Sequence, residues 1–341
     1  MSEGVDATSI SSASSAVTLT YREAITAAIE DEMAADPAVI LIGEDVATAG
    51  GVFKTNEGLA ERFGRDRVRN TPICENTFLG VALGMAVTGL RPIVEIMFSD
   101  FLPTAGDAIV NELPKFRFMS GGQCTVPLTV RSIGGGTGRF GTQHSATGES
   151  WFLQLPGMKV VTLSTPAAAY ATLRAAVRDE QPVLVYEHKG LYNSKGPVVR
   201  DSASLAPVGT AEVMREGRDI TVVGTMLMLN RALTAAQQIR DSVDVEVIDL
   251  RWLRPMDTTT VEKSVARTGR LLVVEEQVHT AGWGATIISQ LAMRGMRWKA
   301  RPRSLSLPDD APIPYSPPLE DELIPSVQTV AEAIRSIMAE G

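Results

Sequence analysis

Cysteine and histidine are scarce in this chain of 341 residues, which contains two of the first and three of the second. The cysteines, Cys74 and Cys124, do not form a C-x-x-C pair, and three histidines are too few for a His-rich metal site. We expect both cysteines to be small core residues. This usage is typical of a reducing cytoplasm rather than of a disulfide-stabilised secreted protein.

The chain also lacks an excess of positive charge and long apolar runs. With 32 basic and 40 acidic residues, its formal net charge is −8. This balance argues against a nucleic-acid or anionic-membrane partner, and no run approaches the ~18 apolar residues of a membrane span. Residues 1–17 are rich in Ser and Ala but have no basic start and no long apolar core. We therefore expect a disordered tail rather than a secretory signal.

Short apolar strand patterns alternate with helical patterns along the rest of the chain. In the first half we expect strands at 39–42, 92–98, 126–131, 158–163 and 182–187. Continuous apolar strands that alternate with helices indicate an α/β fold, in which helices cover both faces of a parallel sheet.

The chain length predicts about two domains. A stretch rich in Gly, Pro and Ser, with little periodicity, separates two series of strand and helix patterns. We therefore predict a first domain over 18–195, a linker over 196–207 and a smaller α/β domain over 208–341.

The helix expected at 77–89 is unusual because it consists almost wholly of small and apolar residues. A helix that is apolar on every face is expected to be buried. Glu75 stands where the preceding loop turns into this helix, and an unpaired carboxylate there would be costly. A ligand or a protein partner must therefore satisfy Glu75, and the residues around it favour a ligand.

Four ordered motifs give the chain a family resemblance. They are T-P-I-C-E (71–75), R-P-I-V-E-I-M-F-S-D-F (91–101), Q-H-S (143–145) and P-G-M-K-V-V (156–161). The chain resembles the beta subunit of the decarboxylating component of 2-oxo acid dehydrogenase complexes, a family that includes the pyruvate, branched-chain and acetoin dehydrogenases. The similarity covers roughly residues 18–341, including G-E-D-V near the start, E-H-K-G-L-Y at 187–192 and D-L-R-W-L-R-P-M-D at 249–257.

The resemblance implies a pyrimidine-binding thiamine diphosphate domain followed by a transketolase C-terminal-like domain. It also implies an α2β2 heterotetramer, with a second beta subunit and with thiamine diphosphate at the α–β interface. In this family the alpha subunit holds the diphosphate and magnesium through a G-D-G motif and a later pair of Asn residues. This chain has only G-D-A at 106–108, inside an expected helix. We therefore expect it to hold half of a cofactor.

The resemblance also assigns roles to four residues. Glu75 matches the carboxylate that hydrogen-bonds the pyrimidine ring nitrogen and so activates the cofactor, which requires one buried carboxylic acid in a fixed place. Phe101 matches the aromatic residue that stacks on the aminopyrimidine, although a core Phe is the alternative. Met97 matches a pocket position and either contacts cofactor or packs. Glu44 matches a Glu near the aminopyrimidine, and a capping or solvated Glu is an equal alternative.

His144 follows a glycine-rich loop, which lets backbone approach a ligand closely but is also a generic flexible turn. It matches a histidine that lines the active-site channel and serves in binding the lipoyl arm and transferring the acyl group, where a group titrating near neutrality is useful. Arg139 in the same loop is a candidate for attracting a substrate carboxylate. For His188 and His279 we favour structural roles.

Two weaker sites follow from the same resemblance. The family has a potassium site just before the strand at 182–187, and Asp179 matches one of its ligands. Gln181 stands where some relatives have Asn, and Ala176 where the contact is a backbone carbonyl. The acidic residues Glu320, Asp321 and Glu322 are either a solvated surface or a dock for a basic domain of the lipoyl acyltransferase core.

Taken together, the motifs predict the beta subunit of a thiamine diphosphate-dependent 2-oxo acid dehydrogenase, with pyruvate or acetoin preferred over branched-chain substrates. A split transketolase-like or acyloin-forming enzyme of specialised metabolism is an alternative, and a non-catalytic scaffold is another. An NAD-binding oxidoreductase is disfavoured because no strand is followed by G-x-G-x-x-G with a downstream acid. Because the family buries its C-terminal domains against each other, we also expect a dimer of this chain.

Overall fold

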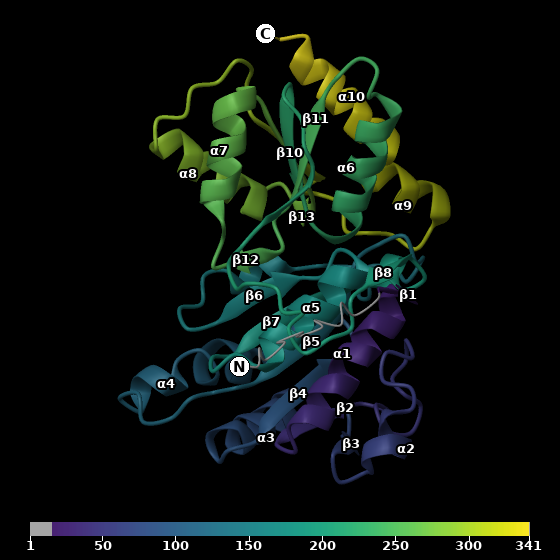
Figure 1. Ribbon diagram of the computed structural model, residues 1–341, viewed down its shortest axis with the longest axis vertical. Coiled ribbons are helices and arrows are strands. Elements are labelled where there is room, and N and C mark those ends of the chain that lie inside the picture. The colour runs from purple at the N-terminus through teal and green to yellow at the C-terminus, as the bar shows by residue number, and fades with distance from the viewer. Residues whose placement is uncertain (1–15, 341) are drawn as a thin grey trace, which may run out of the picture.

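The computed structural model describes residues 16–340, which form two α/β domains packed against each other (Figure 1). A seven-stranded sheet forms the first domain. In spatial order its strands are β12 (Trp252–Arg254), β6 (Lys159–Thr162), β7 (Val183–His188), β5 (Thr129–Gly134), β4 (Arg91–Ile96), β2 (Val39–Gly43) and β3 (Val68–Asn70). All neighbouring pairs are parallel except β12 and β6. The predicted parallel sheet is therefore confirmed.

Helices cover the first sheet, and their starts follow local sequence signals. In α1 (Tyr21–Ala35), Thr20 and Glu23 form the predicted capping box, because each side chain bonds the other residue's backbone N–H. The remaining helices are α2 (Leu59–Phe63), α3 (Glu75–Val87), α4 (Phe116–Met119) and α5 (Pro166–Val177), with short turns at Ser99–Ala105, Ala108–Glu112, Glu149–Phe152 and Lys189–Leu191.

The second domain is built on a five-stranded sheet. Its strands in spatial order are β14 (Arg303–Leu307), β13 (Leu271–Val278), β10 (Ile220–Gly224), β11 (Val245–Asp249) and β9 (Glu212–Arg215), of which only β9 is antiparallel to its neighbour. Helices lie on both sides of it in Figure 1: α6 (Met226–Gln238), α7 (Thr258–Thr268), α8 (Trp283–Met293), α9 (Pro317–Leu323) and α10 (Val327–Met338). The predicted two-domain α/β architecture is confirmed.

The edges of the predicted segments differ from the structure. Strand β1 (Val17–Thr20) pairs antiparallel with β8 (Lys195–Val198), so Val17 of the expected tail and residues 196–198 of the expected linker form a small sheet. Residues 1–15 lie outside the described part of the chain. Strand β12 follows β11 of the second domain and yet pairs with the first sheet, an exchange that only the three-dimensional fold reveals.

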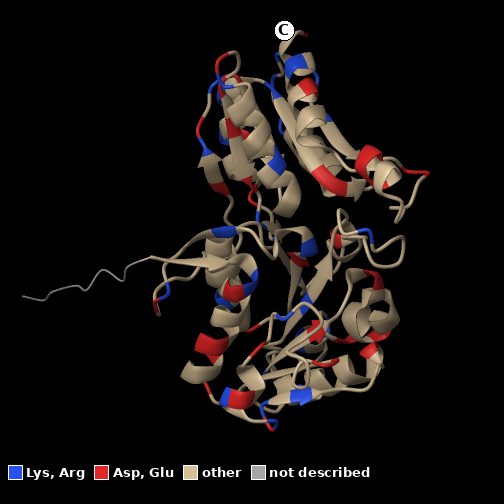
Figure 2. Ribbon diagram, turned by 90° about the vertical axis from the view of Figure 1, so that its right-hand side faces the viewer, with Lys and Arg blue, Asp and Glu red and all other residues tan. Residues whose placement is uncertain are grey.

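Acidic and basic residues are interspersed over both domains (Figure 2). Among residues 16–340, no helix is long and apolar enough to cross a membrane. Both cysteines are unpaired, and Cys74 is exposed while Cys124 is half-buried. The prediction that both are core residues was therefore wrong.

Candidate active site

The predicted site residues other than Asp179 lie around the carboxyl edge of the first sheet. Glu44 directly follows β2, Met97 directly follows β4, and the segment that leads to His144 follows β5. Because parallel strands all end at the same edge, loops far apart in sequence meet there, and this edge is where open α/β sheets bind ligands.

Glu44 and Glu75 lie close enough for their charges to interact. Burial raises the pKa of Glu44, and repulsion from Glu75 raises it further. Oxygen Oε1 of Glu44 is buried and has no hydrogen-bond partner within the described chain. Glu75 is the first residue of α3 and is half-buried. A buried carboxylate oxygen without a donor is costly, so this corner of the site calls for an N–H or O–H from a ligand or a partner.

Aromatic rings form the adjacent wall. The His144 ring lies 4.6 Å from the ring of Phe98 and 5.4 Å from that of Phe101, nearly perpendicular to both. Phe101 is half-buried, whereas Phe98 is buried. The structure thus brings two predicted residues, Phe101 and His144, into contact. Met97 is half-buried beside Phe98 in sequence, at the end of β4.

A second carboxylate, that of Asp100, lies near His144. Oxygen Oδ2 of Asp100 is buried without a partner in the described chain, and burial raises the pKa of Asp100. Hydrogen bonds from backbone N–H groups, that of Ala146 first, and the nearby Lys189 ammonium act in the opposite direction. The Lys189 ammonium donates to the backbone oxygen of His144 at 2.5 Å, and burial lowers the pKa of Lys189 to about 8. Sequence reasoning assigned no role to Asp100 or Lys189.

A buried ion network supports this edge of the sheet. Arg131, fully buried in β5, donates from Nε to Glu187 at 2.6 Å and from Nη1 to Glu95 at 3.1 Å. Asn56 accepts from the same guanidinium at 3.0 Å and donates to Glu95 at 2.7 Å. Burial alone would lower the pKa of Arg131, but the two carboxylates raise it above its ordinary value. In the sequence, the only sign of this network is that each of three mainly apolar strands contains a charged residue: Glu95, Arg131 or Glu187.

The structure gives Arg139 a partner other than a substrate. Its guanidinium pairs with Glu320 at 2.5 Å and with Asp321 at 2.7 Å. Glu320 is fully buried and so belongs neither to a solvated surface nor to an open docking patch, whereas Asp321 and Glu322 are exposed. Arg139 and two of the acidic residues of α9, which the sequence analysis treated separately, therefore form ion pairs between the two domains.

Asp179 lies at the opposite, amino edge of the sheet. Its carboxylate pairs with the Lys159 ammonium at 2.5 Å and accepts from the Gln181 backbone N–H at 2.9 Å. The backbone oxygens of Val177 and Asp179 both accept from Arg91, at 3.3 Å each. The Asp179 carboxylate thus already has a cationic partner in Lys159, and the two backbone oxygens have one in Arg91. No group of His, Cys, Asp and Glu able to hold a metal occurs among residues 16–340.

Helix α3 is not buried on every face, contrary to the prediction. Phe78, Leu79 and Ala82 face the core, but Val81 is 50% exposed and Ile73, just before the helix, is 82% exposed. Gly80 and Gly84 lie on the exposed side. The prediction of a helix without a polar face was correct. Within residues 16–340, however, one apolar face of α3 is not covered.

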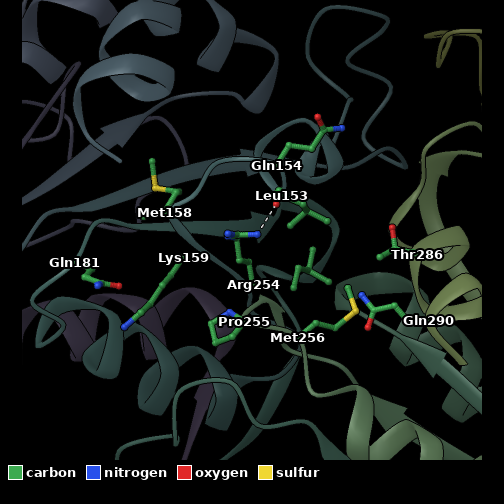
Figure 3. Close-up of a pocket in the computed structure, with 12 residues that line it drawn as sticks. Leu153, Gln154, Met158, Lys159, Gln181, Arg254, Pro255, Met256, Thr286 and Gln290 are labelled. Carbon is green, nitrogen blue, oxygen red and sulfur yellow. Dashed lines mark hydrogen bonds between the residues drawn. The ribbon is translucent and has the colours of Figure 1, made fainter. Parts of the chain in front are cut away.

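Two cavities lie away from this edge. One of about 620 Å³ lies between the domains and is lined by Lys159, Arg254 and Met256 among others, with Arg254 donating to the Leu153 carbonyl at 2.9 Å (Figure 3). The other, of about 680 Å³, is mostly apolar and adjoins Phe118. Neither is lined by Glu44, Glu75, Met97, Phe101 or His144, although Gln181 of the predicted potassium site lines both.

Known proteins match both domains. The family model described as "Transketolase, pyrimidine binding domain" matches residues 17–195, and "Transketolase, C-terminal domain" matches residues 209–330. A solved structure titled "Split gene transketolase, inactive beta4 tetramer" has a TM-score of 0.76 over 94% of this chain and 98% of that chain, at 21% identity. That likeness supports the fold alone. Fold and domain content thus define a transketolase-like protein.

Sequence relatives narrow this class. The acetoin:2,6-dichlorophenolindophenol oxidoreductase subunit beta of Cupriavidus necator is 38% identical, with 95% of this chain and 98% of the relative covered. Two pyruvate dehydrogenase E1 component beta subunits are each 39% identical over 94% of this chain: that of Rickettsia conorii, covered over 98% of its length, and that of Rhizobium meliloti, covered over 70%. The chain belongs to this family of pyruvate and acetoin dehydrogenase beta subunits.

Proposed function

We propose that this chain supplies the pyrimidine-binding half of a thiamine diphosphate site in a dehydrogenase that acts on pyruvate or acetoin. The observation that carries the proposal is the buried Glu44 oxygen near Glu75, which has no hydrogen-bond partner among residues 16–340. An aminopyrimidine offers the amino hydrogens and ring nitrogen that such a pair of carboxylates can bind. Family membership is an independent line of support.

The residues of this edge divide the work by their chemistry. When bound, thiamine diphosphate would supply the nucleophilic carbon of the reaction. Glu75 would hold a proton toward the pyrimidine ring nitrogen, and Glu44 would accept a hydrogen bond at Oε1. Phe101 would offer an apolar ring face, and Met97 would fill space in the pocket. His144 would donate or accept a proton as the acyl group passes to a lipoyl arm.

An alpha subunit completes the site in this proposal, which gives an α2β2 heterotetramer. The exposed apolar surface around α3 supports such a partner. The helix begins at Glu75, and both Val81 on the helix and Ile73 just before it are exposed. The alpha subunit would also hold magnesium and the diphosphate. Since Lys159 already pairs with Asp179, we do not extend the proposal to a potassium ion bound by that carboxylate.

The partners of this complex are a second copy of the chain and a lipoyl acyltransferase core, which accepts the acyl group. Free, partly accessible cysteines suit a reducing compartment such as the cytoplasm. The docking site for the acyltransferase is not assigned to the acidic residues of α9, because Arg139 already pairs with two of them.

Turnover by the purified complex tests the proposal. The chain is co-expressed with an alpha subunit of the same family and assayed with an artificial electron acceptor on pyruvate, acetoin and 3-methyl-2-oxobutanoate. We expect activity that requires both subunits and prefers pyruvate or acetoin. Acceptance of the branched-chain substrate alone would reassign the substrate. An assembled complex inactive on all three, but active in joining two carbonyl compounds, would favour the acyloin-forming alternative.

A further inference from the structure

One residue of the second domain holds both ends of the loop that carries His144. This loop, residues 135–147, is here called the His144 loop. At its start, the Gly136 backbone N–H donates to the carboxylate of Glu276 in β13. At its end, the Thr147 hydroxyl donates to the backbone oxygen of Glu276 at 2.9 Å. Glu276 is buried, so neither bond competes with bulk water.

The second carboxylate oxygen of Glu276 contacts His188, the last residue of β7. It lies 3.0 Å from Nε2 of His188, whose Nδ1 accepts from the Gly190 backbone N–H at 3.0 Å. Nδ1 is therefore an acceptor, and Nε2 donates to Glu276. A Cβ on Gly135 would lie only 1.9 Å from His188 Nε2, so the backbone of the loop passes directly against this pair.

His144 itself is held by the residue that follows His188. Lys189 donates from its ammonium to the His144 backbone oxygen at 2.5 Å. The two ends of the His144 loop and His144 itself are thus connected to Glu276, directly or through the His188–Lys189 segment. Glycines at 135, 136, 138 and 141 give this loop wide conformational freedom in the absence of such contacts.

We propose that Glu276 is a positioning residue, through which the second domain fixes His144 at the active site for acyl transfer. This inference rests on the role of His144 in the proposed function. The carboxylate does not touch the reacting groups. It acts by restricting a loop whose displacement by about 1 Å can cost on the order of 100-fold in rate.

The test compares two activities of the assembled complex. Substitutions Glu276→Gln and, independently, Thr147→Val loosen opposite ends of the loop. The control Glu246→Gln changes another buried carboxylate of the second domain, which pairs with Arg267 away from the loop. Each variant is assayed for reductive acylation of a lipoyl domain and for turnover with an artificial acceptor, which needs no acyl transfer to lipoate.

We expect Glu276→Gln to lower kcat for lipoyl acylation by about 10-fold or more, with KM for the lipoyl domain changed less than about 2-fold. Thr147→Val should act in the same direction, and artificial-acceptor turnover should fall much less in both. Trypsin should also cleave after Arg139 faster in these variants of the full chain than in Glu246→Gln. Equal losses in both activities, or unchanged acylation and cleavage, would overturn the inference.

A His144→Gln variant separates this inference from the proposed function. Lipoyl acylation retained by His144→Gln would refute the role of His144 and, with it, the reason for positioning that residue. Acylation lost in His144→Gln but retained in Glu276→Gln and Thr147→Val would leave the proposed function intact and refute the positioning role of Glu276.

Discussion

Arg131 illustrates at the scale of a residue how charge is tolerated inside the first domain. Its guanidinium, Glu95 and Glu187 are all buried, and each carboxylate oxygen that Arg131 contacts lies within 3.1 Å of it. Such a cluster is weak evidence for added stability, but removal of one member leaves an uncompensated charge in a medium of low dielectric. The network therefore holds three neighbouring strands, β4, β5 and β7, in one arrangement at the edge where the site lies.

We predict that Arg131→Met lowers the free energy of unfolding by about 3–5 kcal/mol, because two buried carboxylates lose their cation. Urea denaturation followed by circular dichroism measures the change. Arg218, whose side chain is 89% exposed, provides the control, since Arg218→Met should cost less than about 0.5 kcal/mol. Similar values for the two variants would show that the network is not needed for stability.

At the scale of elements, local patterns predicted more than non-local pairing. The Thr20–Glu23 capping box and the apolar strands β2, β4 and β7 were visible because helix caps and burial leave local signals. The exchange of β12 into the first sheet was not visible, because strand pairing depends on residues about 90 positions apart. Equally, no local signal could pair Arg139 with Glu320, which lies in α9.

In the candidate site, too, local motifs were predictable and contacts between distant parts of the chain were not. Glu44, Glu75, Phe101 and His144 were predicted by motif, and the structure brings Glu44 near Glu75 and Phe101 against His144. Glu276 escaped prediction because it lies in the other domain and contacts the loop through space. The burial of α3 was mispredicted since composition reports apolar surface but not which molecule covers it.

The turn after the His144 loop predicts a pH effect on stability. Glu149 is fully buried, burial raises its pKa to about 8, and Gln277 donates to its carboxyl group. The protonated form is therefore favoured by folding. This contribution is full below the ordinary pKa of 4.5 and is lost as pH rises toward about 8.

We accordingly expect the Tm of the wild-type chain to fall more between pH 5 and 8 than the Tm of Glu149→Gln, whose amide stays neutral throughout this range. Differential scanning calorimetry in matched buffers measures both slopes. Glu57→Gln, at an exposed position, should retain the wild-type slope. Parallel slopes for wild type and Glu149→Gln would contradict a neutral Glu149 in the folded chain.

At the scale of the whole molecule, the chain has the features of one half of an assembly. Within the described part of the chain, the carboxyl edge of the first sheet holds carboxylate oxygens of Glu44 and Asp100 that lack a hydrogen-bond partner, and helix α3 exposes an apolar face. The two domains are nevertheless joined by specific bonds: Ser164 donates to Asp249 at 2.9 Å and accepts from the Met226 backbone N–H at 2.8 Å. The chain thus presents a fixed surface to its partner.

Val81→Arg tests the partner surface on α3. A charged side chain at this half-exposed position should be tolerated by the chain itself but should abolish or strongly weaken binding to the alpha subunit, because it would be buried there without a partner. Size-exclusion chromatography with light scattering measures assembly, and thermal unfolding of the chain alone measures folding. Val213→Arg, at an exposed strand of the second domain, should assemble normally. Normal assembly of Val81→Arg would place the alpha subunit elsewhere.

The most direct test of the central claim is a titration of thiamine diphosphate into the purified complex of this chain with its alpha subunit, with turnover on the preferred substrate as the readout. We predict saturable, magnesium-dependent activity in the wild type. In Glu75→Gln, which should assemble normally, turnover should fall by about 100-fold or more at saturating cofactor. Wild-type turnover that does not depend on thiamine diphosphate, or that is unchanged in an assembled Glu75→Gln complex, would contradict the account.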